Sequence, residues 1–140
     1  MSDNLAAMDT KSTKIKLLFV DDDPTEFEIM QNLCRDTESH KIDLVCKQTI
    51  EEACEILVSQ EIDMVLLDNQ LLFEDDFRKS APKLRAQGYT GPIGIVSSNI
   101  RNDYFNQFEE YGADFRIGKD ELDRATIFHI INEFAPKTVH

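Results

Sequence analysis

The chain has 140 residues, of which 41% are hydrophobic and 30% charged, and its formal net charge at pH 7 is −12. This size and balance predict one globular domain with its own core and exclude a largely disordered chain. The acidic excess argues against nucleic acid and anionic membranes as partners, because both attract basic surfaces.

No apolar run approaches the length of a membrane span, and the first residues lack the apolar segment of a signal peptide. The three cysteines show no paired spacing and fall within helix or strand patterns, which predicts buried, reduced thiols in a cytoplasmic protein and no zinc site. Residues 1–13 and 136–140 are expected to form loose tails around a domain at 14–135.

Strand and helix patterns alternate five times along the chain. Apolar strands are expected at 15–20, 42–47, 64–67, 92–96 and 113–117. Helices are expected after each of them, at about 24–37, from 50 to at least 57, 77–87, 99–111 and 120–135. Alternating units of this kind predict an α/β doubly wound fold, with a parallel five-stranded sheet in the flavodoxin-like order 2-1-3-4-5 and helices on both faces.

The helix starts are predicted from capping residues. Asp23 precedes Pro24 at the first helix, and Thr49 with Glu52 matches a capping box at the second. Asn99 and Asp120 are expected to cap the fourth and fifth helices. Pro82 lies inside the third helix pattern, so that helix either is kinked or begins near Ser80, and the later start is favoured.

Polar side chains follow four of the expected strands. Three carboxylates, one hydroxyl and one ammonium group stand at these strand ends: Asp21 and Asp22, Asp68, Ser97, and Lys119. Because the carboxyl ends of parallel strands share one rim of a sheet, these groups are expected to meet in one crevice. Clustered carboxylates favour Mg²⁺, and Asp68 then has the chemistry to accept a phosphoryl group.

The motifs around these residues resemble the receiver domain of bacterial two-component response regulators. The resemblance covers residues 14 to about 134 and is carried by LLFVDDDP, MVLLD, GIVSS and YGADFRIGK, at Leu17–Pro24, Met64–Asp68, Gly94–Ser98 and Tyr111–Lys119. It implies that Asp68 accepts phosphate from a histidine kinase or a phosphotransfer protein, with Ser97 and Lys119 contacting the phosphoryl group.

The resemblance also implies a ligand set and an output surface. Asp22 and Asp68 would bind Mg²⁺ directly, Asp21 through water, and the Gln70 backbone carbonyl would add a ligand. Gln70 and Asn99 would influence how fast the phosphate is lost. A downstream protein would bind the face formed by the fourth helix, the fifth strand and the fifth helix.

The sequence departs from the family pattern next to the lysine. Arg116 occupies the position where the family usually has an aromatic switch residue, and Phe115 stands beside it. Since strand residues alternate faces, Phe115 is not expected to take over that position. Arg116 is therefore either the reporter of the phosphorylated state or an ordinary exposed arginine. Asp120 replaces the usual proline after Lys119, so this peptide bond is expected to be trans.

Two apolar segments have alternative interpretations. Leu71, Leu72 and Phe73 follow the site and either fold onto the core, which is favoured, or form a docking ridge. The fourth helix carries Tyr104, Phe108 and Tyr111 on one stripe with Phe105 adjacent, so part of this aromatic surface is expected to stay exposed.

The leading interpretation is a stand-alone, single-domain response regulator that catalyses only its own phosphorylation and dephosphorylation and is not otherwise an enzyme. The alternative is a pseudo-receiver, a protein-interaction module that works without phosphorylation. A small magnesium-dependent phosphohydrolase is disfavoured, because no inserted cap domain is visible to exclude water.

Overall fold

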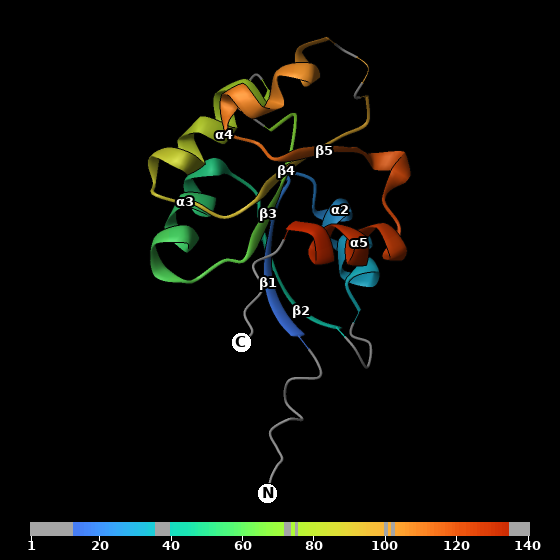
Figure 1. Cartoon of the computed structure of the whole chain (residues 1–140). Coiled ribbons are helices and arrows are strands. Elements are labelled where there is room, and N and C mark those ends of the chain that lie inside the picture. Colours follow the sequence, from blue (N-terminus) through green and yellow to red (C-terminus); the bar gives the residue numbers. More distant parts are fainter. Residues whose placement is uncertain are drawn as a thin grey trace, which may run out of the picture.

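The computed structural model describes residues 13–35, 40–71, 74, 76–99, 101 and 103–134. One parallel sheet organises the chain in the order β2-β1-β3-β4-β5, as predicted (Figure 1). Its strands are β1 (Thr13–Val20), β2 (His40–Lys47), β3 (Met64–Asp68), β4 (Ile93–Ser97) and β5 (Phe115–Gly118). The predicted tails lie outside the described residues except for Thr13, which begins β1.

Besides the strands, the described residues contain four α-helices and two 3₁₀ helices. They are α2 (Pro24–Leu33), α3 (Ile50–Ser59), α4 (Phe77–Ala86) and α5 (Arg124–Phe134), with η1 (Asp103–Tyr111) between β4 and β5 and η2 (Lys119–Glu121) after β5. Figure 1 shows α2 and α5 on one side of the sheet and α3 and α4 on the other. No helix in the described part of the chain is long and apolar enough to cross a membrane.

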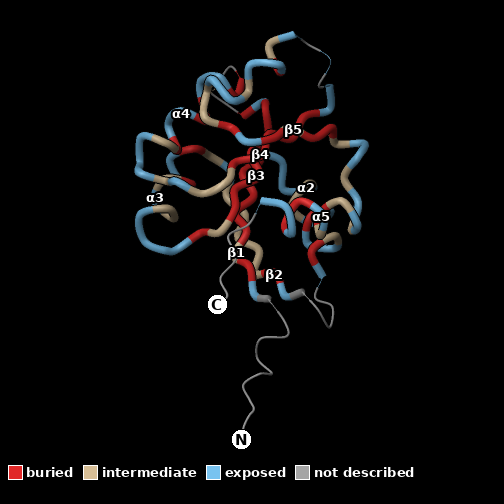
Figure 2. Tube along the Cα trace, in the orientation of Figure 1, coloured by how far each residue is buried: buried red, intermediate tan, exposed pale blue. Residues whose placement is uncertain are grey.

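Side chains that alternate along each strand build a core on each face. Leu17, Phe19 and Leu66 pack towards α2 and α5, whereas Leu18, Val20 and Leu67 pack towards α3, α4 and η1. The central strands β3 and β4 are buried along their whole length (Figure 2). This explains their near-continuous apolar sequence, because helices cover both faces.

The first two predicted helix starts are confirmed. The Asp23 carboxylate accepts a hydrogen bond from Thr25 N, and Pro24 is the first helical residue of α2. Thr49 Oγ1 accepts from Glu52 N at 3.1 Å, and Glu52 Oε1 in turn accepts from Gln48 N at 2.9 Å. This exchange resembles a capping box in which the glutamate reaches one residue further back.

The predicted late start of the third helix is wrong. Helix α4 begins at Phe77, and Pro82 lies inside it. Asp76 caps the helix by accepting from Arg78 N at 2.9 Å, and Asn69 Oδ1 accepts from Phe77 N at 3.0 Å. Because these two side chains satisfy first-turn donors, the helix starts well before the proline.

The caps predicted for the last two helices are also wrong. The fourth helix is the 3₁₀ helix η1, which begins at Asp103 and is kinked at Gln107, while Asn99 Oδ1 accepts from Arg101 N, before the helix. Asp120 lies within η2, and α5 is capped by Asp123, which accepts from Thr126 N at 2.8 Å. The short helix η2 moves the start of α5 by one turn.

Gly94 on β4 leaves room for the Phe115 ring of its β5 partner. The two residues are paired in register, and a Cβ added to Gly94 would clash with the Phe115 ring. Phe115 is buried and stacks on Phe134 of α5, with ring centroids 4.4 Å apart. A side chain at position 94 would therefore displace a ring that joins the sheet to α5.

We expect Gly94→Ala to lower the free energy of unfolding by about 1–3 kcal/mol, the usual cost of overpacking a core. Urea denaturation measures this change. The matched test is Gly94→Ala in a Phe115→Leu background, where the smaller side chain should remove most of the cost. Equal costs in the two backgrounds would show that the ring contact is not responsible.

Candidate functional site

The predicted site residues lie at the carboxyl-end rim of the sheet. Asp21 and Asp22 directly follow β1, and Asp68 and Ser97 are the last residues of β3 and β4. Lys119 begins η2, immediately after β5. The parallel strand order thus brings side chains from four separate segments to one edge of the sheet. Open α/β sheets bind their ligands at this edge, beyond the carboxyl ends of the strands.

Three carboxylates form a compact cluster. One oxygen from each of Asp21, Asp22 and Asp68 lies within 4.8 Å of the other two. Asp21 is only 1% exposed, and its Oδ1 accepts from Asp23 N at 2.9 Å. Its Oδ2 is buried and has no hydrogen-bond donor among the described residues. An all-oxygen donor set with an unsatisfied buried oxygen fits a hard divalent cation such as Mg²⁺.

Lys119 is the cation of the site. Its Nζ lies 3.2 Å from Asp68 Oδ1 and 3.6 Å from Asp21 Oδ2. A further carboxylate, Glu26, approaches at 4.0 Å from the first turn of α2. Glu26 was not predicted, because an acid in the first turn of a helix is common and carries no sign of a site. One ammonium group therefore serves several carboxylates, and the site retains an excess of negative charge.

Burial and repulsion shift the protonation of these groups. Burial, together with the neighbouring Asp21 carboxylate, raises the pKa of Asp68 to about 7, although Lys119 opposes the shift. Burial also raises the pKa of Asp21. Burial alone would lower the pKa of Lys119, but the Asp68 and Asp21 carboxylates outweigh it and the net shift is upward. The site thus favours bound positive charge.

Ser97 lies at the rim without contacting the ion pair. The side chain is buried, and its hydroxyl exchanges two 3.2 Å hydrogen bonds with the backbone of Asn99, donating to the carbonyl and accepting from the amide. Gln70 is exposed two residues after Asp68. Contact between Ser97 and a group on Asp68 therefore requires the hydroxyl to turn away from Asn99.

Arg116 and Phe115 lie on opposite faces of the sheet, as their alternation predicted. Phe115 belongs to the core under α5, whereas the Arg116 guanidinium carbon lies 5.6 Å from the centroid of the Phe108 ring on η1. The Arg116 Nε is buried and has no hydrogen-bond partner in the described part of the chain. The expected trans bond after Lys119 is confirmed, since the described residues contain no cis peptide.

The aromatic and loop predictions are partly tested. Phe105 is fully buried, while Tyr104, Phe108 and Tyr111 remain partly exposed, as expected for that stripe. Leu71 is 4% exposed and packs in the core, in line with the favoured interpretation. Leu72 and Phe73 lie outside the described residues.

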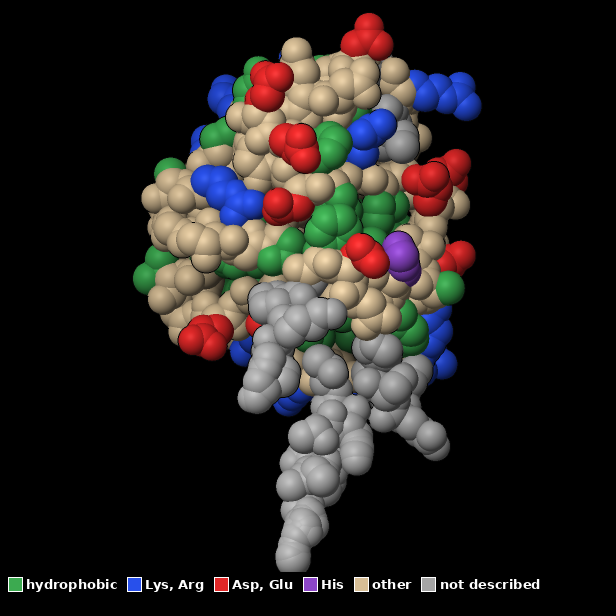
Figure 3. All heavy atoms as spheres, in the orientation of Figure 1, with side chains coloured by type: hydrophobic (Ala, Val, Ile, Leu, Met, Phe, Trp, Pro, Cys, Tyr) green, Lys and Arg blue, Asp and Glu red, His purple; other side chains and the backbone are tan. Residues whose placement is uncertain are grey.

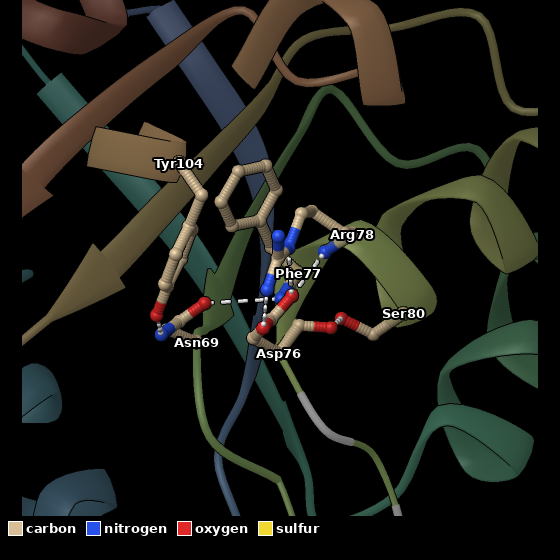
Figure 4. A network of polar contacts seen from close by, with 6 residues as sticks. All are labelled: Asn69, Asp76, Phe77, Arg78, Ser80 and Tyr104. Atoms are coloured by element: carbon tan, nitrogen blue, oxygen red, sulfur yellow. Dashed lines mark hydrogen bonds and ion pairs between the residues drawn. The ribbon is translucent and has the colours of Figure 1, made fainter. Parts of the chain in front are cut away.

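A residue that the sequence did not single out, Asn69, lies directly after Asp68. It is 2% exposed, and its Nδ2 donates to Tyr104 Oη at 3.1 Å (Figure 4). Its backbone amide donates to Val96 O at 2.8 Å. In sequence, an asparagine after a strand indicates only a turn. Its link to η1 depends on a contact between residues 35 positions apart, which no local pattern predicts.

Comparison with known proteins agrees with this geometry. Residues 17–132 match the response regulator receiver domain, and the chain belongs to that family. No curated protein matches the sequence.

Three solved structures share the fold. The BeF₃-activated N-terminal receiver domain of Klebsiella pneumoniae RstA has 25% identity and a TM-score of 0.72, covering 85% of this chain and 97% of that chain. The receiver domain of the Pseudomonas aeruginosa sensor histidine kinase PA1611, with magnesium in its active site cleft, has 20% identity and a TM-score of 0.70, covering 87% and 98%. Vibrio cholerae chemotaxis protein CheY4 has 16% identity and a TM-score of 0.73, covering 87% and 99%.

The raised pKa of Asp68 predicts a pH-dependent stability. Because the folded state holds this proton more tightly than the unfolded chain, stability falls as the pH rises from about 4 to about 7, and the loss is complete above that. In metal-free buffer, the free energy of unfolding of Asp68→Asn should therefore rise relative to that of wild type over this pH interval, by on the order of 2 kcal/mol.

Urea denaturation of both proteins at pH 4.5 and pH 8 measures the difference. Asp103→Asn, which removes an exposed carboxylate, should reproduce the wild-type dependence. A gain of equal size at both pH values for Asp68→Asn would contradict the assignment to ionisation of Asp68.

Proposed function

We propose that this receiver domain accepts a phosphoryl group on Asp68 from a histidine kinase or a phosphotransfer protein, in a reaction that requires Mg²⁺. The observation that carries the proposal is the buried Asp68 carboxylate, clustered with Asp21 and Asp22 and 3.2 Å from the Lys119 ammonium. A cation neutralises the repulsion that an incoming phosphoryl dianion would meet there.

The family resemblance implies the ligand roles. Asp22 and Asp68 would bind Mg²⁺ directly, together with the Gln70 backbone carbonyl. Asp21 would act through a water, since its Oδ2 lacks a hydrogen-bond donor and a metal-bound water supplies one. The PA1611 receiver domain has magnesium in its active site cleft, which supports Mg²⁺ as the cation here. When bound, the ion supplies charge neutralisation for the attack of Asp68 on phosphorus.

Ser97 and Lys119 complete the phosphoryl pocket in this proposal. Lys119 would transfer its contact from Asp68 Oδ1 to a phosphoryl oxygen, a small movement for a flexible point charge. Ser97 would exchange its bonds with Asn99 for one to a second phosphoryl oxygen. Both groups act on the domain's own phosphoryl group, so the protein is a signalling module with slow self-dephosphorylation.

A downstream protein is the proposed reader of the phosphorylated state. The surface that the family resemblance implies consists here of η1, β5 and α5. In Figure 3, hydrophobic side chains gather near the centre of the face that carries α5, with Asp and Glu side chains around them. Such a surface suits contact with protein and does not suit nucleic acid.

Arg116 is the proposed switch residue in place of an aromatic side chain. Its Nε is buried without an acceptor among the described residues, and its guanidinium lies against Phe108 of η1. An unsatisfied buried donor is costly, so a rearrangement that offers it an acceptor is favourable. Phosphorylation would supply that rearrangement by moving Ser97 and the loop that leads to η1.

Incubation with acetyl phosphate and Mg²⁺ should add one phosphoryl group, measured as intact mass. The gain should be absent in Asp68→Asn and in wild type treated with EDTA, because the nucleophile or the cation is then missing. Asp103→Asn should gain as wild type does. No gain in wild type, together with no Mg²⁺ binding by titration, would favour the pseudo-receiver alternative.

The side chain of Arg116 should respond to phosphorylation in an NMR experiment. The Nε–H resonance of Arg116 is expected to shift when the phosphodonor is added, because its donor gains an acceptor. The Nε–H resonance of Arg124, whose guanidinium donates to the Asn32 carbonyl on the α2 side, is the internal control and should stay in place. A stationary Arg116 signal in a protein phosphorylated by mass would exclude the switch role.

A further inference from the structure

Asn69 occupies the face of the sheet opposite to the site. Asp68 contacts Lys119 in the crevice, and the next side chain along the strand direction points towards α4 and η1, as alternation requires. Asn69 thus belongs to the same backbone segment as Asp68 while its side chain contacts different elements. Any displacement of this segment therefore moves side chains on both faces of the sheet at once.

The Asn69 side chain is held at two points. Its Oδ1 accepts from Phe77 N at the start of α4, and its Nδ2 donates to Tyr104 Oη of η1 (Figure 4). The Tyr104 ring stacks on Phe105 with centroids 4.7 Å apart, and the Arg78 guanidinium carbon lies 4.2 Å from its centroid. Arg78 is in turn paired with the capping residue Asp76 at 2.8 Å. A series of contacts thus leads from Asn69 through Tyr104 to the exposed residue Arg78.

Helix η1, which receives the hydrogen bond from Asn69, is held only weakly by its own backbone hydrogen bonds. Helix η1 runs over nine residues as a 3₁₀ helix and is broken at Gln107, where φ is −100° and ψ is 18°. The break divides η1 into two short 3₁₀ segments, whose hydrogen bonds are poorly aligned, and such segments often mark hinges. Tyr104 lies in the half before the break, so side-chain contacts decide where that half sits.

We propose that Asn69 transmits the phosphorylation of Asp68 to η1 through its hydrogen bond to Tyr104. This inference rests on the proposed phosphoacceptor function and specifies how that site is read. Asp68 and Gln70, the neighbours of Asn69, would both be drawn to the phosphoryl group and its cation. The Asn69 side chain then moves away from η1, the bond to Tyr104 breaks, and the first half of η1 is released.

The geometry makes Tyr104→Phe the decisive variant. It removes the hydroxyl that accepts from Asn69 and keeps the ring that contacts Phe105 and Arg78. Tyr111→Phe is the matched control, since it removes a hydroxyl from the other half of η1 without touching Asn69. Asn69→Ala removes the donor of the same hydrogen bond.

The experiment is hydrogen–deuterium exchange of peptides covering 103–111, with and without acetyl phosphate and Mg²⁺, with the intact mass of each sample recorded. In wild type, phosphorylation should speed exchange of the η1 amides about fivefold, the factor one hydrogen bond of ordinary net strength supplies. Tyr104→Phe should exchange about fivefold faster before phosphorylation and change little after it, while gaining the phosphoryl group as wild type does. Asn69→Ala should share its fast exchange, and Tyr111→Phe should behave as wild type.

Each alternative result has a distinct meaning. A phosphorylated wild type whose η1 exchange is unchanged overturns the inference, and so does a full phosphorylation response in Tyr104→Phe. The same loss of response in Tyr111→Phe would assign the effect to any η1 hydroxyl and overturn the role of Asn69. A wild type that gains no mass overturns the proposed phosphoacceptor function itself, and the transmission with it.

Discussion

The ion pair between Lys119 and Asp68 is the interaction on which the site depends. The ammonium group must offset the Asp21 and Asp68 carboxylates, which are nearly buried, and it also lies near Glu26. Burial and the neighbouring Asp21 carboxylate outweigh this one positive charge, so the pKa of Asp68 rises to about 7, and Asp21 Oδ2 has no hydrogen-bond donor among the described residues. The fold thereby maintains a local excess of negative charge that a divalent cation relieves.

The same sheet geometry that assembles the site separates the residues beside it. On β5, Phe115 is committed to the α5 face, where Gly94 leaves it space and Phe134 stacks on it. Arg116 consequently faces η1, where a guanidinium cannot be buried as an aromatic ring can, because its Nε needs an acceptor. Arg116 therefore places next to η1 a buried donor that has no partner in the described part of the chain, a condition that an aromatic side chain would not create.

The site was predictable where chemistry coincides with the end of an apolar run. Asp21, Asp22, Asp68, Ser97 and Lys119 each follow or end a buried strand, and parallel order alone brings them to one rim. Helix caps were predictable only where no tertiary partner competes, as at Asp23 and Thr49. At Asp76, the salt bridge to Arg78 and the contact of Asn69 with Phe77 N start the helix before the position that Pro82 suggested. Asn69 and Glu26 act through contacts distant in sequence, which periodicity does not encode.

Contacts from the carboxyl end of β3 and from β5 act on the two halves of helix η1. Asn69 holds Tyr104 before the break at Gln107, and Arg116 lies against Phe108 after it. Phe105, next to Tyr104 in the first half, is fully buried and stacks on Phe77 with centroids 5.5 Å apart, so this residue keeps η1 attached to the core. The break at Gln107 separates the two halves. In our proposals, loss of the Asn69 bond would loosen the first half around this anchor, and a new acceptor for Arg116 would reposition the second, so that the surface of η1 depends on both strands that flank β4.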